Sequence, residues 1–180
     1  MMTADQAREL WASSEEIVSA QEVQDSLDRM ASEITDKMGN DFPLVLSVMG
    51  GAVVFTGMLL PKLQFPLEFD YIHLSRYNNK TVGGEMQWRV APRESVKDRV
   101  VLVLDDILDE GETMAAIRQR IMDMGAKEFH AAVLCEKTLT KLKPMHPDFC
   151  GFKVPDRYVF GCGMDVKGYW RNLGAIRALV

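Results

Sequence analysis

The chain has 180 residues, 47% of them hydrophobic and 26% charged, and its formal net charge is −5 at pH 7. This length is typical of one domain with its own core, so residues 1–180 are taken as a single domain. The acidic balance argues against a nucleic-acid-binding protein, and no run of about 18 apolar residues is available to cross a membrane. Three scattered cysteines (Cys135, Cys150 and Cys162) and an N-terminus unlike a leader peptide favour a reduced, cytoplasmic protein.

The N-terminal part is predicted to be helical. Residues 3–15 are mostly polar and indicate a short helix or an arm. Ser19 and Glu22 form a capping box, after which apolar residues recur every three or four positions. This pattern predicts an amphipathic helix that ends at Gly39.

Strands and helices then alternate along the chain. The continuous apolar run 43–49 is typical of a buried strand in a parallel sheet, and Gly50-Gly51 separates it from a helix over 52–60. A second strand is expected over 65–75. Residues 76–87 are polar and contain glycine, and a loop this long in a compact domain is usually functional.

The C-terminal half continues this alternation. Strands are predicted near 87–90, over 100–104 and over 129–135, with a helix over 113–124 whose apolar residues share one face. From residue 138 the chain looks irregular, apart from a short strand at 157–160. The pattern predicts an α/β fold with a mainly parallel central sheet flanked by helices. Ligands bind such sheets beyond the carboxyl ends of the strands.

One strand end carries the strongest functional motif. The aliphatic run 100–104 leads into Asp105 and Asp106, and a turn at 109–113 then opens the next helix. Backbone N–H groups at a helix start bind anions, and Gly111 allows a phosphate to approach closely. The alternative is a helix whose first turn carries acids that suit its dipole, which would explain Glu110 and Glu112 but not the paired aspartates.

This segment resembles the motif of the phosphoribosyltransferases, which bind phosphoribosyl pyrophosphate in such a turn. Further segments match in order: 48–51, Arg76-Tyr77, Lys137, and 157–161 followed by Asp165 and Arg171. Their combination is similar to the hypoxanthine-guanine branch. The resemblance implies the type I phosphoribosyltransferase fold, with a small hood built from the N- and C-terminal segments.

The resemblance also implies roles for individual residues. Asp109 would face purine N7 as the catalytic acid or base, and loop 76–87 would close over the reaction. Phosphoribosyl pyrophosphate and its phosphates would be bound by Met49, Gly50, Gly51, Arg76, Tyr77, Asp105, Asp106, Glu110, Gly111, Glu112, Thr113 and Arg171. The purine site would contain Lys137, Tyr158, Val159 and Asp165, and magnesium would be held by Asp105, Asp106 and Asp165. A cis peptide bond is expected at Val48–Met49.

Three residues depart from the pattern of the relatives. Met49 stands where some of them have lysine, Glu110 replaces a common threonine, and Glu112 replaces lysine or a small polar residue. Two additional acids would repel a phosphate. We therefore expect both glutamate side chains to point away from it and the backbone N–H groups to bind it.

The implied activity is purine salvage: hypoxanthine or guanine and phosphoribosyl pyrophosphate would give the mononucleotide and pyrophosphate, with magnesium, in a homodimer or homotetramer. One alternative is an RNA-binding regulator of pyrimidine operons with the same motif, against which the acidic charge argues. Another is a transferase for xanthine or adenine. Lys137 favours a 6-oxo group over the 6-amino group of adenine, because an ammonium group only donates hydrogen bonds.

Overall fold

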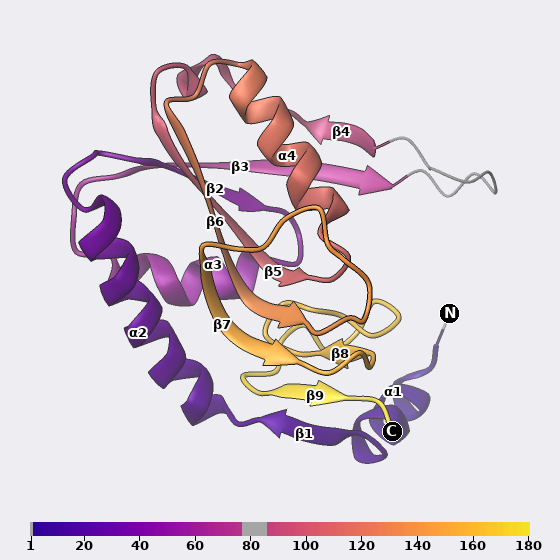
Figure 1. The fold of residues 1–180 in the computed structure, drawn as a ribbon. Coiled ribbons are helices and arrows are strands. Elements are labelled where there is room, and N and C mark those ends of the chain that lie inside the picture. Colours follow the sequence, from indigo (N-terminus) through magenta and orange to yellow (C-terminus); the bar gives the residue numbers. More distant parts are fainter. Residues whose placement is uncertain (1, 77–85) are drawn as a thin grey trace.

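A six-stranded sheet forms the centre of the molecule and a three-stranded sheet lies at one end (Figure 1). The computed structural model describes residues 2–76 and 86–180. The central sheet has the order β4-β3-β2-β5-β6-β7, and only the β3–β4 pair is antiparallel. Its strands are β2 (Leu44–Val48), β3 (Glu68–Arg76), β4 (Met86–Val90), β5 (Val100–Leu108), β6 (Glu128–Lys137) and β7 (Phe149–Val154). The predicted mainly parallel sheet is confirmed.

Helices cover both faces of this sheet. Helices α2 (Ala20–Met38) and α3 (Val53–Leu59) lie on one face and α4 (Glu112–Asp123) on the other. The remaining elements are α1 (Ala4–Ala12), which lies at the hood, and short 3-10 turns at Leu60–Lys62 and Glu94–Val96. The Ser19 hydroxyl accepts from the Glu22 N–H, and the Glu22 carboxylate accepts from the Ser19 N–H, so the predicted capping box is present. Among the described residues, no helix is both long and apolar enough to cross a membrane.

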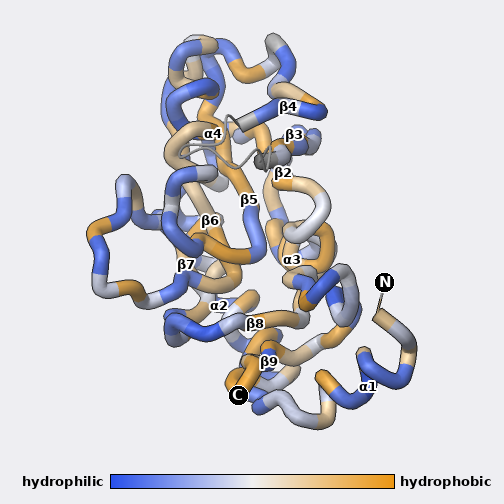
Figure 2. The backbone as a smooth tube through the Cα atoms, turned by 90° about the vertical axis from the view of Figure 1, so that its right-hand side faces the viewer, coloured by the Kyte–Doolittle hydropathy of each residue, from blue (hydrophilic) through white to orange (hydrophobic). Residues whose placement is uncertain are grey.

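Strand β5 is buried by helices on both of its faces. Leu102 and Leu104 pack with α2 and α3 in one hydrophobic cluster, whereas Val101 and Val103 pack with α4 in the other. Successive strand residues point to opposite faces, so a strand between two helical layers needs an unbroken hydrophobic run. In Figure 2 this hydrophobic stretch of β5 gives way to a hydrophilic one, where the aspartates lie.

The smaller sheet is formed by both ends of the chain, as expected for the hood. Strand β9 (Ile176–Ala178) lies between β1 (Glu15–Val18) and β8 (Val159–Phe160), and both pairs are antiparallel. Helix α1 packs against this region: the Trp170 indole N–H donates to the Ala7 carbonyl at 2.7 Å, and the Trp11 and Trp170 rings lie 6.4 Å apart. The N-terminal segment is thus a helix plus a strand.

Several element boundaries differ from the prediction. Strand β5 continues past residue 104 through both aspartates to Leu108, because the parallel pairing with β6 persists to Glu136. Strand β7 occupies a segment predicted to be irregular, and β1 and β9 were also not predicted. These strands are short or lack regular alternation, so their hydrophobic pattern is weak.

Candidate active site

A pocket of about 250 Å³ opens where β5 and β6 end, beneath the hood. It is lined by Asp106, Ile107, Asp109, Lys137, Tyr158, Val159, Met164 and Asp165. Six of these eight were predicted to belong to the site. The apolar Ile107 and Met164 were not, because single aliphatic residues carry no sequence signal for a ligand.

A second, smaller hollow adjoins the first at the start of α4. It is lined by residues of the predicted phosphate turn, among them Asp105, Glu110, Gly111 and Thr113. Gly111 is the residue before the helix and has a φ of 83°, in the left-handed region that favours glycine. Gly111 has no side chain to cap the helix, and the N–H groups at a helix start are suited to bind an anion.

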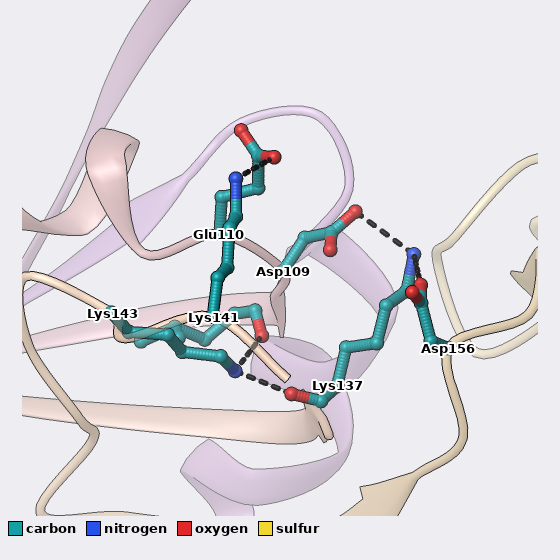
Figure 3. Close-up of polar contacts among 7 residues, drawn as sticks. Asp109, Glu110, Lys137, Lys141, Lys143 and Asp156 are labelled. Atoms are coloured by element: carbon teal, nitrogen blue, oxygen red, sulfur yellow. Dashed lines mark hydrogen bonds and ion pairs between the residues drawn. The ribbon is translucent and has the colours of Figure 1, made fainter. Parts of the chain in front are cut away.

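The two glutamates of this turn are placed differently. Glu112 is exposed, whereas Glu110 is partly buried and forms an ion pair with Lys141 from the loop after β6 (Figure 3). The Lys141 charge offsets that of Glu110 and therefore reduces its repulsion of a phosphate. Lys141 was not predicted, because it lies in a segment without periodicity.

Asp105 and Asp106 are partly buried at the end of β5. Burial raises the pKa of Asp105 well above its ordinary value of 3.8, and the adjacent Asp106 charge raises it further. Burial also raises the pKa of Asp106, although hydrogen bonds and the charge of Arg171 oppose the rise. Desolvating two neighbouring acids is unfavourable for folding, so hydroxyl groups or a cation are suitable ligands here.

Asp109 and Lys137 meet at the edge of the pocket. The Lys137 ammonium donates to a carboxylate oxygen of Asp109 at 2.9 Å and lies 3.9 Å from Asp156 (Figure 3). The Lys137 side chain is 14% exposed and that of Asp109 50% exposed. The pocket thus presents a hydrogen-bond donor beside an acceptor.

The turn after β2 approaches Asp106 closely. A Cβ atom on Gly51 would lie only 2.0 Å from an Asp106 carboxylate oxygen, so any side chain at residue 51 would displace this carboxylate. A Cβ on Gly163, in the hood, would lie 2.0 Å from the Gly51 carbonyl oxygen. The cis peptide bond is Met49–Gly50, so its predicted position at Val48–Met49 was wrong by one residue.

Asp165 and Arg171 are paired. The Arg171 guanidinium donates to an Asp165 carboxylate oxygen and to the Gly163 carbonyl, both at 2.6 Å. The Gly168 N–H donates to the other oxygen of Asp165, also at 2.6 Å. Arg171 therefore fixes the hood turn that contains Gly163 and Asp165. This turn approaches the Gly51 turn through Gly163.

Comparisons with known proteins agree with this geometry. The phosphoribosyl transferase domain model matches residues 13–167. The chain belongs to the phosphoribosyltransferase family. It is 32% identical over 164 residues to the hypoxanthine-guanine phosphoribosyltransferase of Bacillus subtilis, covering 91% of each chain. It is 33% identical over 159 residues to the hypoxanthine-guanine-xanthine phosphoribosyltransferase of Tritrichomonas foetus, covering 88% of this chain and 87% of the relative.

The fold is also that of solved phosphoribosyltransferases. A hypoxanthine phosphoribosyltransferase from Staphylococcus aureus superposes with a TM-score of 0.88 at 22% identity, over 100% of this chain and 97% of that one. At this identity the comparison establishes the fold, which is the predicted type I phosphoribosyltransferase fold with its hood.

Of the remaining predicted site residues, Tyr158 and Val159 line this pocket. Tyr158 is 52% exposed at the pocket wall, and the adjacent Val159 is buried in β8. Arg76 ends β3, but Tyr77 and most of the predicted closing loop lie outside the described residues.

A phosphoribosyltransferase that uses magnesium needs oxygen ligands near the phosphates. Within residues 2–76 and 86–180, no three His, Cys, Asp or Glu side chains are arranged to hold a metal ion. Asp165 is already engaged by Arg171. Asp105 and Asp106 still fit Mg²⁺, because this ion is often held by one or two carboxylates together with substrate oxygens and water.

Proposed function

We propose that the chain transfers the phosphoribosyl group of phosphoribosyl pyrophosphate to hypoxanthine or guanine, releasing pyrophosphate. The relatives with these substrates in their names support it, since they match the chain over most of its length. The acidic net charge offers no support for the RNA-binding alternative.

The contact between Lys137 and Asp109 carries the proposal. In a 6-oxopurine the oxygen at C6 and the nitrogen N7 are neighbours on one edge of the ring. An ammonium group only donates and a carboxylate only accepts, so Lys137 suits O6 while Asp109 suits N7–H. The two side chains lie 2.9 Å apart at the edge of one pocket. The 6-amino group of adenine would face a second donor instead.

The transfer reaction releases one proton from the base, and Asp109 is placed to accept it. A bond forms between N9 and the anomeric carbon while the bond from that carbon to pyrophosphate breaks. A neutral base must lose one proton to become the neutral base of a nucleotide. Asp109 accepts this proton from N7, and general base catalysis of this kind contributes about 10²–10⁴-fold to a rate.

The other described residues bind the sugar and its phosphates. The N–H groups at the start of α4 bind the 5′-phosphate, and Asp105 and Asp106 accept hydrogen bonds from the ribose hydroxyls. Arg171, held by Asp165, lies on the side of the leaving pyrophosphate. When bound, Mg²⁺ would stabilise negative charge on that leaving group, with Asp105 and Asp106 as its protein ligands.

We also propose a reducing, cytoplasmic setting and a homodimer or homotetramer. The three cysteines are free thiols, and burial raises the pKa of Cys162 to about 11, which keeps that thiol protonated. Phe69 and Tyr71 point to the same side of β3 and are 44% and 42% exposed, which favours burial between copies.

The test is an assay of four bases. The purified protein is incubated with phosphoribosyl pyrophosphate, Mg²⁺ and hypoxanthine, guanine, xanthine or adenine, and the mononucleotide formed is identified by chromatography. Turnover of hypoxanthine or guanine with little or none of adenine is expected. Preference for adenine, or no turnover together with tight RNA binding in a filter assay, would refute the proposal.

A further inference from the structure

Lys143 is a buried lysine beside the active site. Its side chain is 4% exposed, although it comes from the loop between β6 and β7. Lysine is rarely buried to this degree without partners, because desolvating an ammonium group is unfavourable. Its partners therefore indicate what the residue does.

The Lys143 ammonium contacts the ends of two neighbouring strands. It donates to the carbonyl of Leu108, the last residue of β5, at 3.3 Å and to the carbonyl of Lys137, the last residue of β6, at 2.5 Å (Figure 3). It also lies 3.5 Å from the carboxylate of Glu136. Three acceptors match the three N–H donors of an ammonium group.

Glu136 is the counter-ion of the Lys143 ammonium group. Its carboxylate is buried and lies 2.6 Å from the imidazole of His146 as well as close to Lys143. Burial acts to raise the pKa of Glu136, but the contacts with His146 and Lys143 lower it below its ordinary value. A negative Glu136 therefore stabilises the buried ammonium group.

The two carbonyls belong to the backbone that carries the base-binding pair. Leu108 directly precedes Asp109, and the other carbonyl is that of Lys137 itself. Beyond these positions both strands become loops, so the sheet no longer fixes the separation of the two chains. The Lys143 ammonium joins them at this point.

We infer that Lys143 is a positioning residue, which sets the distance between the Asp109 carboxylate and the Lys137 ammonium and thereby fits the pocket to the O6 and N7 edge of the purine. The inference rests on the proposed roles of Asp109 and Lys137. It also predicts that the phosphate turn is affected less, because the contacts of the Lys143 ammonium are with Leu108, Glu136 and Lys137 rather than with residues 110–113.

The test compares Lys143→Met with Lys62→Met. Methionine keeps much of the length of lysine but cannot donate to the carbonyls. Lys62 pairs with Asp28 at 2.5 Å, and its side chain is 25% exposed, so the control removes a partly buried lysine elsewhere. Steady-state kinetics give kcat and KM for hypoxanthine and for phosphoribosyl pyrophosphate.

We expect Lys143→Met to lower kcat/KM for hypoxanthine by about 10–100-fold, since a misplacement of about 1 Å can cost a hundredfold. KM for phosphoribosyl pyrophosphate should change less than about twofold, and Lys62→Met should resemble the wild type. Unchanged hypoxanthine kinetics, or equal rises in KM for both substrates, would overturn the inference.

Two further measurements make the outcome unambiguous. Partial unfolding lowers the active concentration and hence the apparent kcat, but it does not raise KM for one substrate alone. If Lys143→Met does not fold, Lys143→Arg keeps the charge but directs its planar donors differently, and the same base-selective rise in KM is expected. Lys137→Met is measured in parallel, because a lack of effect there would contradict the proposed function rather than the role of Lys143.

Discussion

Replacing Gly51 by alanine should lower activity strongly while leaving the fold intact. The added Cβ would lie 2.0 Å from one Asp106 carboxylate oxygen and 2.6 Å from its carboxyl carbon. Restoring an ordinary contact distance of 3.4 Å would displace the carboxylate by about 1.4 Å. Because misplacing a group in an active site by about 1 Å can cost a hundredfold, kcat/KM for phosphoribosyl pyrophosphate should fall by about 100-fold.

The stability of this variant should change much less than its activity. Gly51 has no positive φ, so alanine is allowed there, and the reduced freedom of the unfolded chain contributes about 0.4–1 kcal/mol in favour of folding. This gain offsets part of the strain at Asp106. The assay is a kinetic measurement of mononucleotide formation, paired with thermal unfolding.

Gly57→Ala is the matched control. Gly57 is exposed within α3, and a Cβ there would meet nothing within 4 Å. Alanine should stabilise the helix by about 0.5–1 kcal/mol and leave kcat/KM unchanged. Wild-type activity in Gly51→Ala, or an equal loss in both variants, would refute the reasoning about Asp106.

The other predictions concern single residues or the metal. Asp109→Asn should lower kcat by about 10²–10⁴-fold with nearly normal nucleotide binding, whereas a residue that only caps the helix would tolerate asparagine. Lys137→Met should raise KM for hypoxanthine more than for phosphoribosyl pyrophosphate, and equal rises would contradict its role. The pKa of Asp105 is raised on folding, so its stabilising contribution is present below about pH 3.8 and is lost as pH rises through the folded pKa. Asp105→Asn should therefore raise the Tm of the ligand-free protein at pH 7 and less so near pH 4; a lower Tm at pH 7 would refute this. Excess EDTA should abolish turnover, and undiminished turnover would exclude a required metal.

The central sheet and its main motif were predictable because they depend on local patterns. A strand buried on both faces must be apolar throughout, and the appearance of Asp105 and Asp106 after such a run marks the end of the fully buried part of β5. The cap of α2 was predictable for the same reason, since its two residues are three apart. The resemblance to known phosphoribosyltransferases then indicated which of these residues belong to a site.

Contacts between distant segments could not be predicted in this way. Lys141 and Lys143 lie in a loop without periodicity, and their partners Glu110 and Leu108 are 31 and 35 residues away. The close approach of Gly163 to Gly51 depends on how the hood sits over the sheet. Strand β7 was missed because its burial alternates irregularly, and β5 was predicted too short because polar residues occur before its hydrogen bonding ends.

The most direct test of the site is a crystal structure of the protein with inosine monophosphate. We expect O6 within about 2.7–3.2 Å of the Lys137 ammonium, N7 beside Asp109, and the 5′-phosphate at the N–H groups of residues 111–113. The Lys137–Asp109 hydrogen bond should then be replaced by contacts to the base. A nucleotide bound elsewhere, or bound here with that hydrogen bond intact and the base turned away from it, would contradict the account.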